Sequence, residues 1–263
     1  MIRPSIVAAI VRREIFEIIR NRTLLLAIVL PPVILIALPI IAAAVDTGKH
    51  LSPQVIQNLV AARPEWADFT PKQLASAFGL QQMQFVFLLM PATVPLAIAS
   101  YSIVGEKQTR SLEAVIAAPI STEELLAGKA IAAITPAVLT VWLAYGVLIG
   151  VAALTLGGAI TRVIMDPTWF ATVFALGPAI GLVSVVVGIA ISSRVNDPRA
   201  VQQIGTVILI PLVAFMVLQL QAGQLLATKD YLLAAAGVAA LGVVGIRVAA
   251  RLFGRESILT RWR

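Results

Sequence analysis

Long apolar stretches alternate with shorter polar segments along the whole of this chain. A helix rises about 1.5 Å per residue, so about 20 apolar residues cross a hydrocarbon core of roughly 30 Å. Six stretches meet this requirement, and we therefore predict an all-α integral membrane protein with six transmembrane helices. The predicted spans are residues 24–45, 82–104, 130–156, 169–191, 204–220 and 231–250.

The composition agrees with a membrane protein, since 59% of the 263 residues are hydrophobic and only 13% are charged. A soluble domain carries about 25% charged residues. No polar stretch is long enough for a core of its own, so we predict one transmembrane domain over residues 1–263. The absence of cysteine excludes disulfides and cysteine-bound metals. With one histidine and no nucleophile elbow, the sequence predicts neither an enzyme nor a metal site.

The basic residues are distributed unevenly between the two sides of the predicted membrane domain. Of the 20 Lys and Arg residues, 15 fall in the termini and the loops on their side, and 5 fall in the other loops. Cytoplasmic loops carry the excess of positive charge, so both termini and segment 105–129 are predicted to be cytoplasmic. The net charge of +7 therefore reflects topology, and nucleic-acid binding is not expected.

Residues 1–23 precede the first span and have the pattern of an amphipathic helix. Arg13, Glu17 and Arg20 gather on one face, and apolar residues recur at helical spacing on another. Such a helix suits the cytoplasmic membrane interface, although a charged lead-in that only orients the chain is the alternative. The apolar positions are Ile6, Val7, Ile10, Val11, Ile15 and Ile18.

The outer loop 46–81 is the longest polar segment. Two positions in it read as a helix N-cap followed by proline at the first helical position, which predicts two short surface helices. The second helix is expected to run on into the second span. The motifs are Ser52-Pro53 and Thr70-Pro71, and Gln73 completes a capping box with Thr70.

Glutamines gather near the outer ends of the second and fifth spans. They either line an exit path for a polar or amphiphilic cargo or hydrogen-bond to lipid headgroups, and we prefer the second interpretation. These residues are Gln81, Gln82, Gln84, Gln219, Gln221 and Gln224.

Segment 105–129 is a compact polar insert between the second and third spans. Its pattern predicts two short helices that are separated at Pro119. Ser121 and Glu124 form a capping box at the start of the second helix, which runs through Lys129 into the third span. A structured polar insert on one side of a membrane protein suggests a contact surface for a partner.

Four short motifs follow one another through this insert, namely Glu106-Lys107, Arg110-Ser111-Leu112-Glu113, Pro119-Ile120-Ser121 and Leu126-Ala127-Gly128-Lys129. This run resembles the type-2 permeases of ATP-binding-cassette (ABC) transporters, most of which are exporters. The amphipathic N-terminal helix, the six spans and the long outer loop are also similar to that family. Arg110 departs from the family pattern, in which many members have glycine.

The resemblance implies that the insert is the coupling segment that docks on a separate ATPase subunit. It also implies two ATPase copies that bind ATP and Mg, no cofactor in this chain, a second permease copy or close relative, and a multi-pass location in the plasma or inner membrane. An insert that only packs under the membrane domain is the alternative. The implied contact residues are Glu106, Lys107, Arg110, Leu112, Glu113, Pro119, Ser121, Glu124 and Lys129.

The chain lacks a phosphate-binding loop, because Glu123 stands where the first glycine before Gly128-Lys129 would have to be. All 13 acidic residues lie outside the interiors of the predicted spans, which argues against an ion-coupled carrier. We therefore expect the permease subunit of an ATP-driven ABC exporter, which moves its substrate out of the cytoplasm or the inner leaflet. An ion-coupled secondary carrier and a non-transporting scaffold that recruits a cytoplasmic partner are the alternatives.

Replacing Glu106 and Glu113 together by alanine is expected to abolish transport or ATPase association while membrane insertion stays intact, because both carboxylates belong to the implied docking surface. Co-purification and transport assays measure the effect. Normal transport by the double variant would contradict the assignment of the insert.

Overall fold

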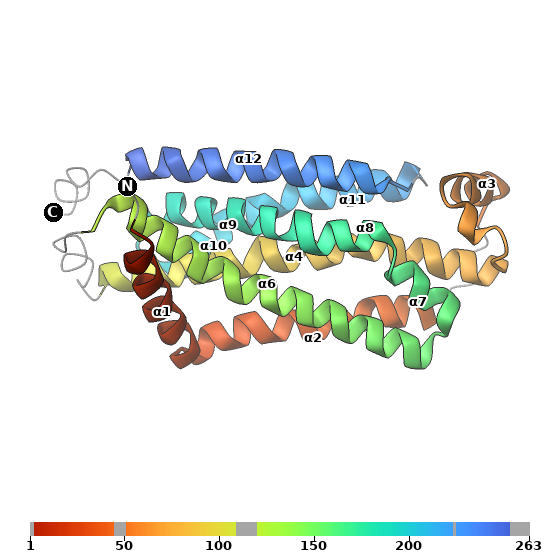
Figure 1. Cartoon of the computed structure of the whole chain (residues 1–263), viewed down its shortest axis with the longest axis horizontal. Helices are drawn as coiled ribbons and strands as arrows, with labels where there is room; N and C mark the ends of the chain where they lie inside the picture. Colours follow the sequence, from red (N-terminus) through yellow and green to blue (C-terminus); the bar gives the residue numbers. More distant parts are fainter. Residues whose placement is uncertain (1–2, 45–50, 109–119, 223–224, 253–263) are drawn as a thin grey trace.

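The structure is a computed structural model that describes residues 3–44, 51–108, 120–222 and 225–252. Every element in these ranges is helical, and most of the helices run along one common axis (Figure 1). The elements are α1 Pro4–Arg20, α2 Arg22–Ala44, α3 Pro53–Ala62, η1 Pro64–Trp66, α4 Pro71–Gln108, α6 Thr122–Thr155, α7 Gly158–Ile164, α8 Pro167–Phe170, η2 Ala171–Leu176, α9 Gly177–Ser192, α10 Pro198–Gly205, η3 Thr206–Ile208, α11 Leu209–Ala222 and α12 Thr228–Leu252.

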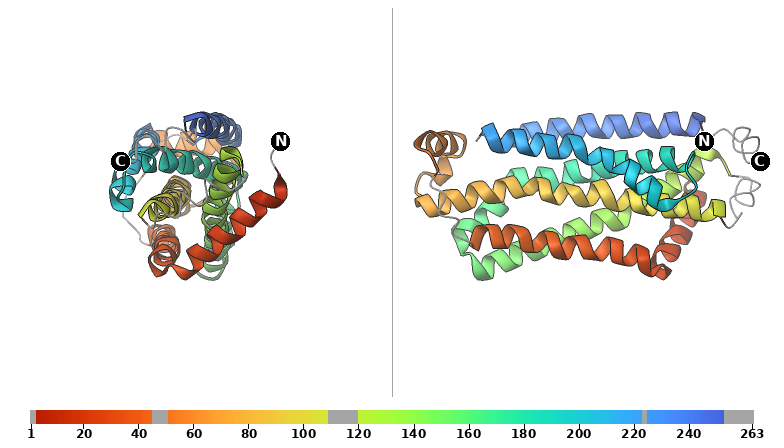
Figure 2. Two further views of the ribbon diagram at one scale, coloured as in Figure 1. Left: turned by 90° about the vertical axis from the view of Figure 1, so that its left-hand side faces the viewer. Right: turned by 180° about the vertical axis from the view of Figure 1, so that it is seen from behind.

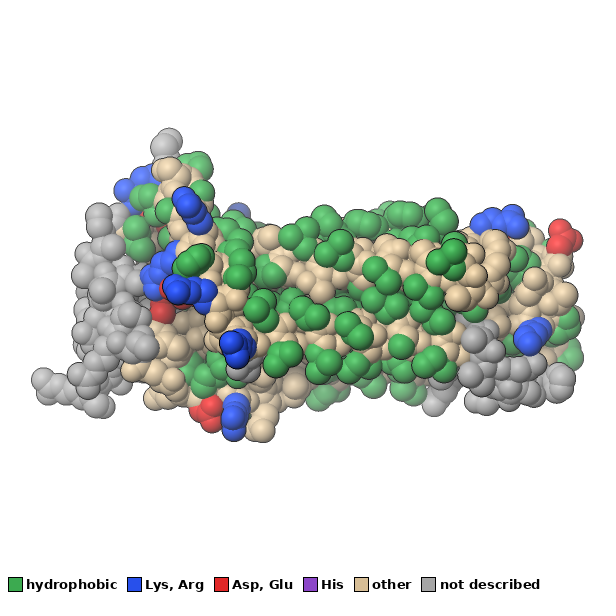
Figure 3. All heavy atoms as spheres, turned by 90° about the horizontal axis from the view of Figure 1, so that it is seen from below, with side chains coloured by type: hydrophobic (Ala, Val, Ile, Leu, Met, Phe, Trp, Pro, Cys, Tyr) green, Lys and Arg blue, Asp and Glu red, His purple; other side chains and the backbone are tan. Residues whose placement is uncertain are grey.

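Six helical segments of the described chain are long and apolar enough to cross a membrane, which confirms the predicted number of spans. On the face seen in Figure 3, the middle of the bundle is apolar and the charged side chains gather toward its two ends. The segments are Leu24–Ile41, Pro71–Gln108, Thr122–Thr155, Gly158–Ser192, Pro198–Gln219 and Thr228–Ala249.

The start of α1, the end of α4, the start of α6 and the end of α12 lie at one end of the bundle (Figure 1). We call this the inner end, and the opposite end, where α3 lies, the outer end. This arrangement agrees with an even number of crossings between the described ends of the chain. That the inner end faces the cytoplasm stays a prediction from the charge distribution.

The predicted capping residues begin their helices. Ser52 accepts a hydrogen bond from the backbone of Val55 at the start of α3. Before α4, the Thr70 hydroxyl accepts from the backbone N–H of Gln73 at 3.3 Å, and the Gln73 side chain accepts from the backbone N–H of Thr70 at 2.9 Å. The helix that starts there continues without a break into the second span, as predicted.

Helix α4 lies at the centre of the bundle and contacts α2, α6, α9, α10 and α11 (Figure 2). Small residues allow α9 to approach it closely. A Cβ atom on Gly188 would lie 3.1 Å from the Cβ of Ala99, and one on Gly181 would lie 3.6 Å from the carbonyl oxygen of Pro91. By contrast, a Cβ atom on Gly146 would have no neighbour within 4 Å. Glycine therefore serves close packing on α9 but not on this face of α6.

The fourth span is a composite of several elements. After α7 and the short α8 it passes through the π-helical segment η2 before α9 begins. Pro178 lacks an N–H group, and its ring clashes with the carbonyl four residues earlier in a regular α-helix, so the wider turn relieves this conflict. The indole N–H of Trp142 donates to the carbonyl oxygen of Val173 at 3.3 Å and so pairs one group of this segment.

The glutamines near the outer end do not all face lipid. Gln81, Gln82 and Gln84 on α4 and Gln219 on α11 are buried, so our preferred interpretation that they hydrogen-bond to headgroups is wrong for these four. Gln84 instead joins the hydroxyls of Thr168 and Thr172 at 3.3 and 3.0 Å. The reason is that α4 is the central helix, which the sequence pattern of one helix cannot reveal.

Replacing Gly188 by leucine is expected to destabilise the bundle by about 1–3 kcal/mol, because the added side chain forces α9 away from α4. Thermal unfolding of the purified protein in detergent, followed by circular dichroism, measures the loss. Gly146→Leu is the matched control, since that position is open and should unfold near the wild-type temperature. Equal unfolding temperatures for the two variants would refute the close packing of α4 on α9.

Candidate coupling site at the inner end

The two ends of the predicted coupling segment meet at the inner end of the bundle. Helix α4 extends through Gln108, so Glu106 and Lys107 belong to its last turn. Helix α6 begins after Ser121, whose hydroxyl accepts from the backbone of Glu124 at 3.1 Å while the Glu124 carboxylate accepts from the backbone of Ser121 at 2.9 Å. This confirms the predicted capping box.

A buried polar cluster surrounds the ammonium group of Lys129 in the second turn of α6. Its Nζ lies 2.7 Å from Oε1 of Glu14 on α1 and 3.0 Å from Oε2 of Glu106 on α4. It also donates to the Ser102 hydroxyl at 2.7 Å, and that hydroxyl donates to the other carboxylate oxygen of Glu14 at 2.7 Å. The four residues of this Lys129 cluster join three helices, and each of the three charged side chains is about 5% exposed or less.

The Lys129 cluster balances its charges with one further residue. Two carboxylates face one ammonium group, and Arg13 lies 3.4 Å from Oε1 of Glu106 at the rim. Removing charges from water costs several kcal/mol each, and only close opposite charges with satisfied hydrogen bonds offset this cost. The inner ends of α1, α4 and α6 are therefore fixed to each other as long as the charges stay paired.

A second link holds the start of α1 to the start of α6. The guanidinium of Arg3 donates to both carboxylate oxygens of Glu124 at 2.9 Å, and the backbone N–H of Arg3 donates to the same carboxylate at 2.8 Å. These hydrogen bonds to Glu124 raise the pKa of the Arg3 guanidinium above its ordinary value. Glu124 thus serves both as the capping residue of α6 and as the anchor of α1.

The end of α4 is also fastened to the end of α9. Lys107 donates from Nζ to the carbonyl oxygen of Ser193 at 3.0 Å and to that of Ser192. Gln108 donates to the carbonyl oxygen of Asn196 at 3.2 Å. The last carbonyls of a helix have no partner within the helix, so a lysine at this place satisfies them and complements the helix dipole.

Five of the nine residues that the resemblance implied for the partner contact belong to the described chain: Glu106, Lys107, Ser121, Glu124 and Lys129. Glu106, Glu124 and Lys129 are buried and directed at other helices of the same chain. The other four, Arg110, Leu112, Glu113 and Pro119, lie outside the described residues. The described part of the segment therefore attaches it to the bundle.

Sequence reasoning missed two members of the Lys129 cluster, Glu14 and Ser102. Glu14 carried a signal, because it stands one turn from Ile10 and one turn from Ile18 on the apolar face of α1. An acidic residue in the middle of such a face needs a buried partner. That face packs against α6, where a Cβ atom on Gly128 would lie 2.6 Å from the side chain of Ile10. The membrane-interface location of α1 stays a prediction.

A separate polar network lies at the outer end. Asp166 caps α8 by accepting from the backbone N–H of Thr168 at 2.8 Å, and it also pairs with Arg63 at 3.0 Å. Arg63 directly follows α3, so the pair ties the outer helices α3 and α8 together. Asp166 therefore has two roles, as a helix cap and as the partner of an ion pair.

Comparison of the sequence with models of protein families gives a match. A family model described as "ABC-2 family transporter protein" matches residues 8–251, which is nearly the whole chain. No curated protein matches the chain.

Replacing Lys129 by alanine is expected to lower the stability of the bundle by about 3–5 kcal/mol, because Glu14 and Glu106 would be left buried without their shared cation. Glu17→Ala removes the exposed Arg13–Glu17 pair, whose atoms are 2.9 Å apart, and should cost about 0–1 kcal/mol. Thermal unfolding in detergent compares the two variants. A Lys129 variant as stable as the Glu17 variant would show that the cluster contributes little.

Proposed function

Because this chain belongs to the ABC-2 transporter family, we propose that it is the permease subunit of an ATP-driven exporter. Members of this family work with ATPase subunits. In the proposed complex two such subunits bind ATP and Mg, and this chain pairs with a second copy or a close relative. The substrate leaves the cytoplasm or the inner leaflet through the membrane domains.

The Lys129 cluster is the observation that carries this proposal. Segment 105–129 includes the end of α4 and the start of α6. Glu106 on the first of these helices and Lys129 on the second bind each other at 3.0 Å, and Glu14 brings in α1. A displacement of the segment therefore moves the inner ends of three helices together, because separating them would expose unpaired charges next to lipid.

The long helices provide the path along which such a displacement travels. Helix α4 runs from the inner end to the outer end without a break and packs on α9 over much of its length. Lys107 fastens the two helices at the inner end. Coupling between distant sites requires packed elements of this kind with two arrangements, and we propose that inward- and outward-facing states are those arrangements.

The roles of docking and force transmission are separable by two single substitutions. Glu113→Gln is expected to lower the amount of ATPase that co-purifies with the chain, because Glu113 belongs to the proposed docking surface. Glu106→Gln should leave co-purification intact but lower permease-dependent ATP hydrolysis about tenfold, since it removes one charge-assisted link between α4 and α6. Co-purification from detergent and ATP hydrolysis by the purified complex are the two measurements.

Arg162→Gln serves as the control, because Arg162 is an exposed charge on α7 at the other end of the bundle. It should change neither measurement. Failure of any ATPase to co-purify with the wild-type chain would overturn the proposed function. Equal loss of co-purification in the Glu106 and Glu113 variants would overturn the division of roles.

A further inference from the structure

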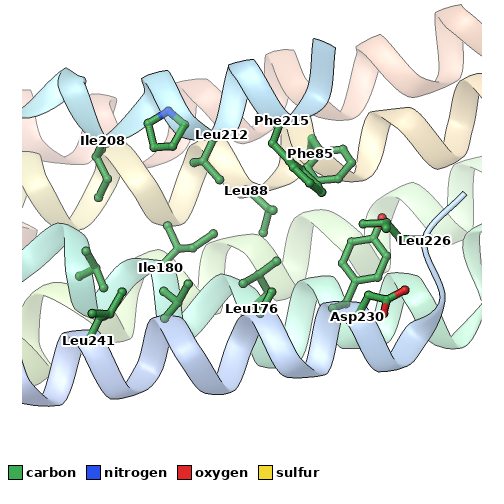
Figure 4. A pocket seen from close by; sticks show the side chains of 15 residues that line it. Phe85, Leu88, Leu176, Ile180, Ile208, Leu212, Phe215, Leu226, Asp230 and Leu241 are labelled. Atoms are coloured by element: carbon green, nitrogen blue, oxygen red, sulfur yellow. The ribbon is translucent and has the colours of Figure 1, made fainter. Parts of the chain in front are cut away.

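An apolar cavity of about 680 Å³ lies between α4, α9, α11 and α12, away from the Lys129 cluster. Figure 4 shows Ile208, Leu212 and Phe215 on one side of it and Leu176, Ile180 and Leu241 on the other. Its volume is within the range of roughly 300–1,000 Å³ that is usual for sites of small molecules. The remaining lining residues are Phe85, Leu88, Val183, Pro211, Leu226, Asp230, Tyr231, Ala234 and Val238.

The cavity is open toward the lipid-facing surface. Phe215 on α11 and Leu241 on α12 line it, and they are 44% and 69% exposed. Helix α11 packs mainly on α4, whereas α12 packs mainly on α9. The two helices that flank the opening therefore pack on different helices of the bundle. Both belong to segments that are apolar enough to span the membrane, and an open apolar space at that depth is accessible to hydrocarbon rather than to water.

Polar groups occur at one end of the cavity only. Asp230, in the first turn of α12, lies there (Figure 4). The next residue, Tyr231, also lines the cavity and has Gln219 of α11 as a side-chain partner. One carboxylate oxygen of Asp230 accepts from the backbone N–H of Ala227 at 2.9 Å, which fixes the side chain at the start of the helix. Asp230 is the one acidic residue of the lining. The cavity thus has a long apolar body and a short acidic outer end.

We propose that this cavity binds one hydrocarbon chain of a bilayer phospholipid that enters between α11 and α12. Its headgroup lies at the outer end and carries a primary amine, which interacts with the Asp230 carboxylate. The apolar lining, the opening at membrane depth and the single acidic end together support this ligand. The site lies within one chain and requires only the membrane location, so it goes beyond the proposed transport function and is independent of it.

Photolabelling of the full chain in nanodiscs tests the site. The nanodiscs contain phosphatidylethanolamine and phosphatidylglycerol. A trace of the phosphatidylethanolamine carries a diazirine in one acyl chain. Mass spectrometry of the digested protein is expected to find adducts on Leu88, Ile180 and Leu212. Ala234→Phe fills the cavity and should lower this labelling about tenfold. Ala236→Phe is the matched control, because Ala236 is exposed on the same helix but does not line the cavity.

The preference for an amine headgroup is tested with a second probe, phosphatidylglycerol that carries the same diazirine-labelled acyl chain. The wild-type chain should favour the ethanolamine probe about threefold, and Asp230→Asn, which retains an acceptor for the Ala227 N–H, should abolish this preference. Before labelling, the unfolding temperatures of Ala234→Phe and Ala236→Phe are compared and should be equal. If Ala234→Phe unfolds, Leu88→Phe is used in its place.

Two results would overturn the site. In the first, Ala234→Phe lowers the labelling of the lining residues no more than it lowers the labelling of the exposed face of α2. This would mean that the probe detects only lipid on the surface of the protein. The other is the absence of adducts from the lining, which would mean that protein fills the cavity. Because the assay contains no ATPase, neither result bears on the permease assignment.

Discussion

The pairing of buried charge at the inner end is the constraint on which the rest of this structure depends. Lys129 lies near the start of α6 and is buried inside the bundle, where neither water nor a lipid headgroup reaches its ammonium group. Its partners must therefore come from the protein, and they come from α1 and α4 at 2.7 and 3.0 Å. A charge that has to be neutralised inside the chain thus holds three helices together, and one of them, α1, is distant from α6 in the sequence.

This constraint gives the N-terminal helix a structural role. An amphipathic helix that rests on a membrane can slide along it, whereas α1 is held by Glu14 in its third turn and by Arg3 at its start. Both bonds end on α6, at Lys129 and Glu124. Helix α1 thus braces the place where the polar segment rejoins the membrane domain.

Along α4 the chemistry changes from one end of the bundle to the other. The inner end carries the Lys129 cluster, the middle contributes Phe85 and Leu88 to the apolar cavity, and the outer part places Gln81 and Gln84 in a polar network with α8. Close packing against glycines of α9 holds this helix in place. Helix α4 contributes residues to all three regions, so a displacement of its inner end would also move residues that line the cavity.

The sequence by itself determined the six apolar spans, the caps that begin α3, α4 and α6, and the link between the polar insert and a family of transporters. These features follow from local spacing, because a span, a capping box and a motif are each read within a few turns of one helix. The sequence also carried a signal for Glu14, whose position on an apolar face implies a partner. Only the tertiary structure decided which helix becomes central, why four of the glutamines are buried, and that Glu106 pairs with Lys129 inside the bundle. The physical reason is that burial and ion pairing depend on neighbours from other helices, such as Thr168 for Gln84 at 84 positions and Lys129 for Glu14 at 115 positions along the chain.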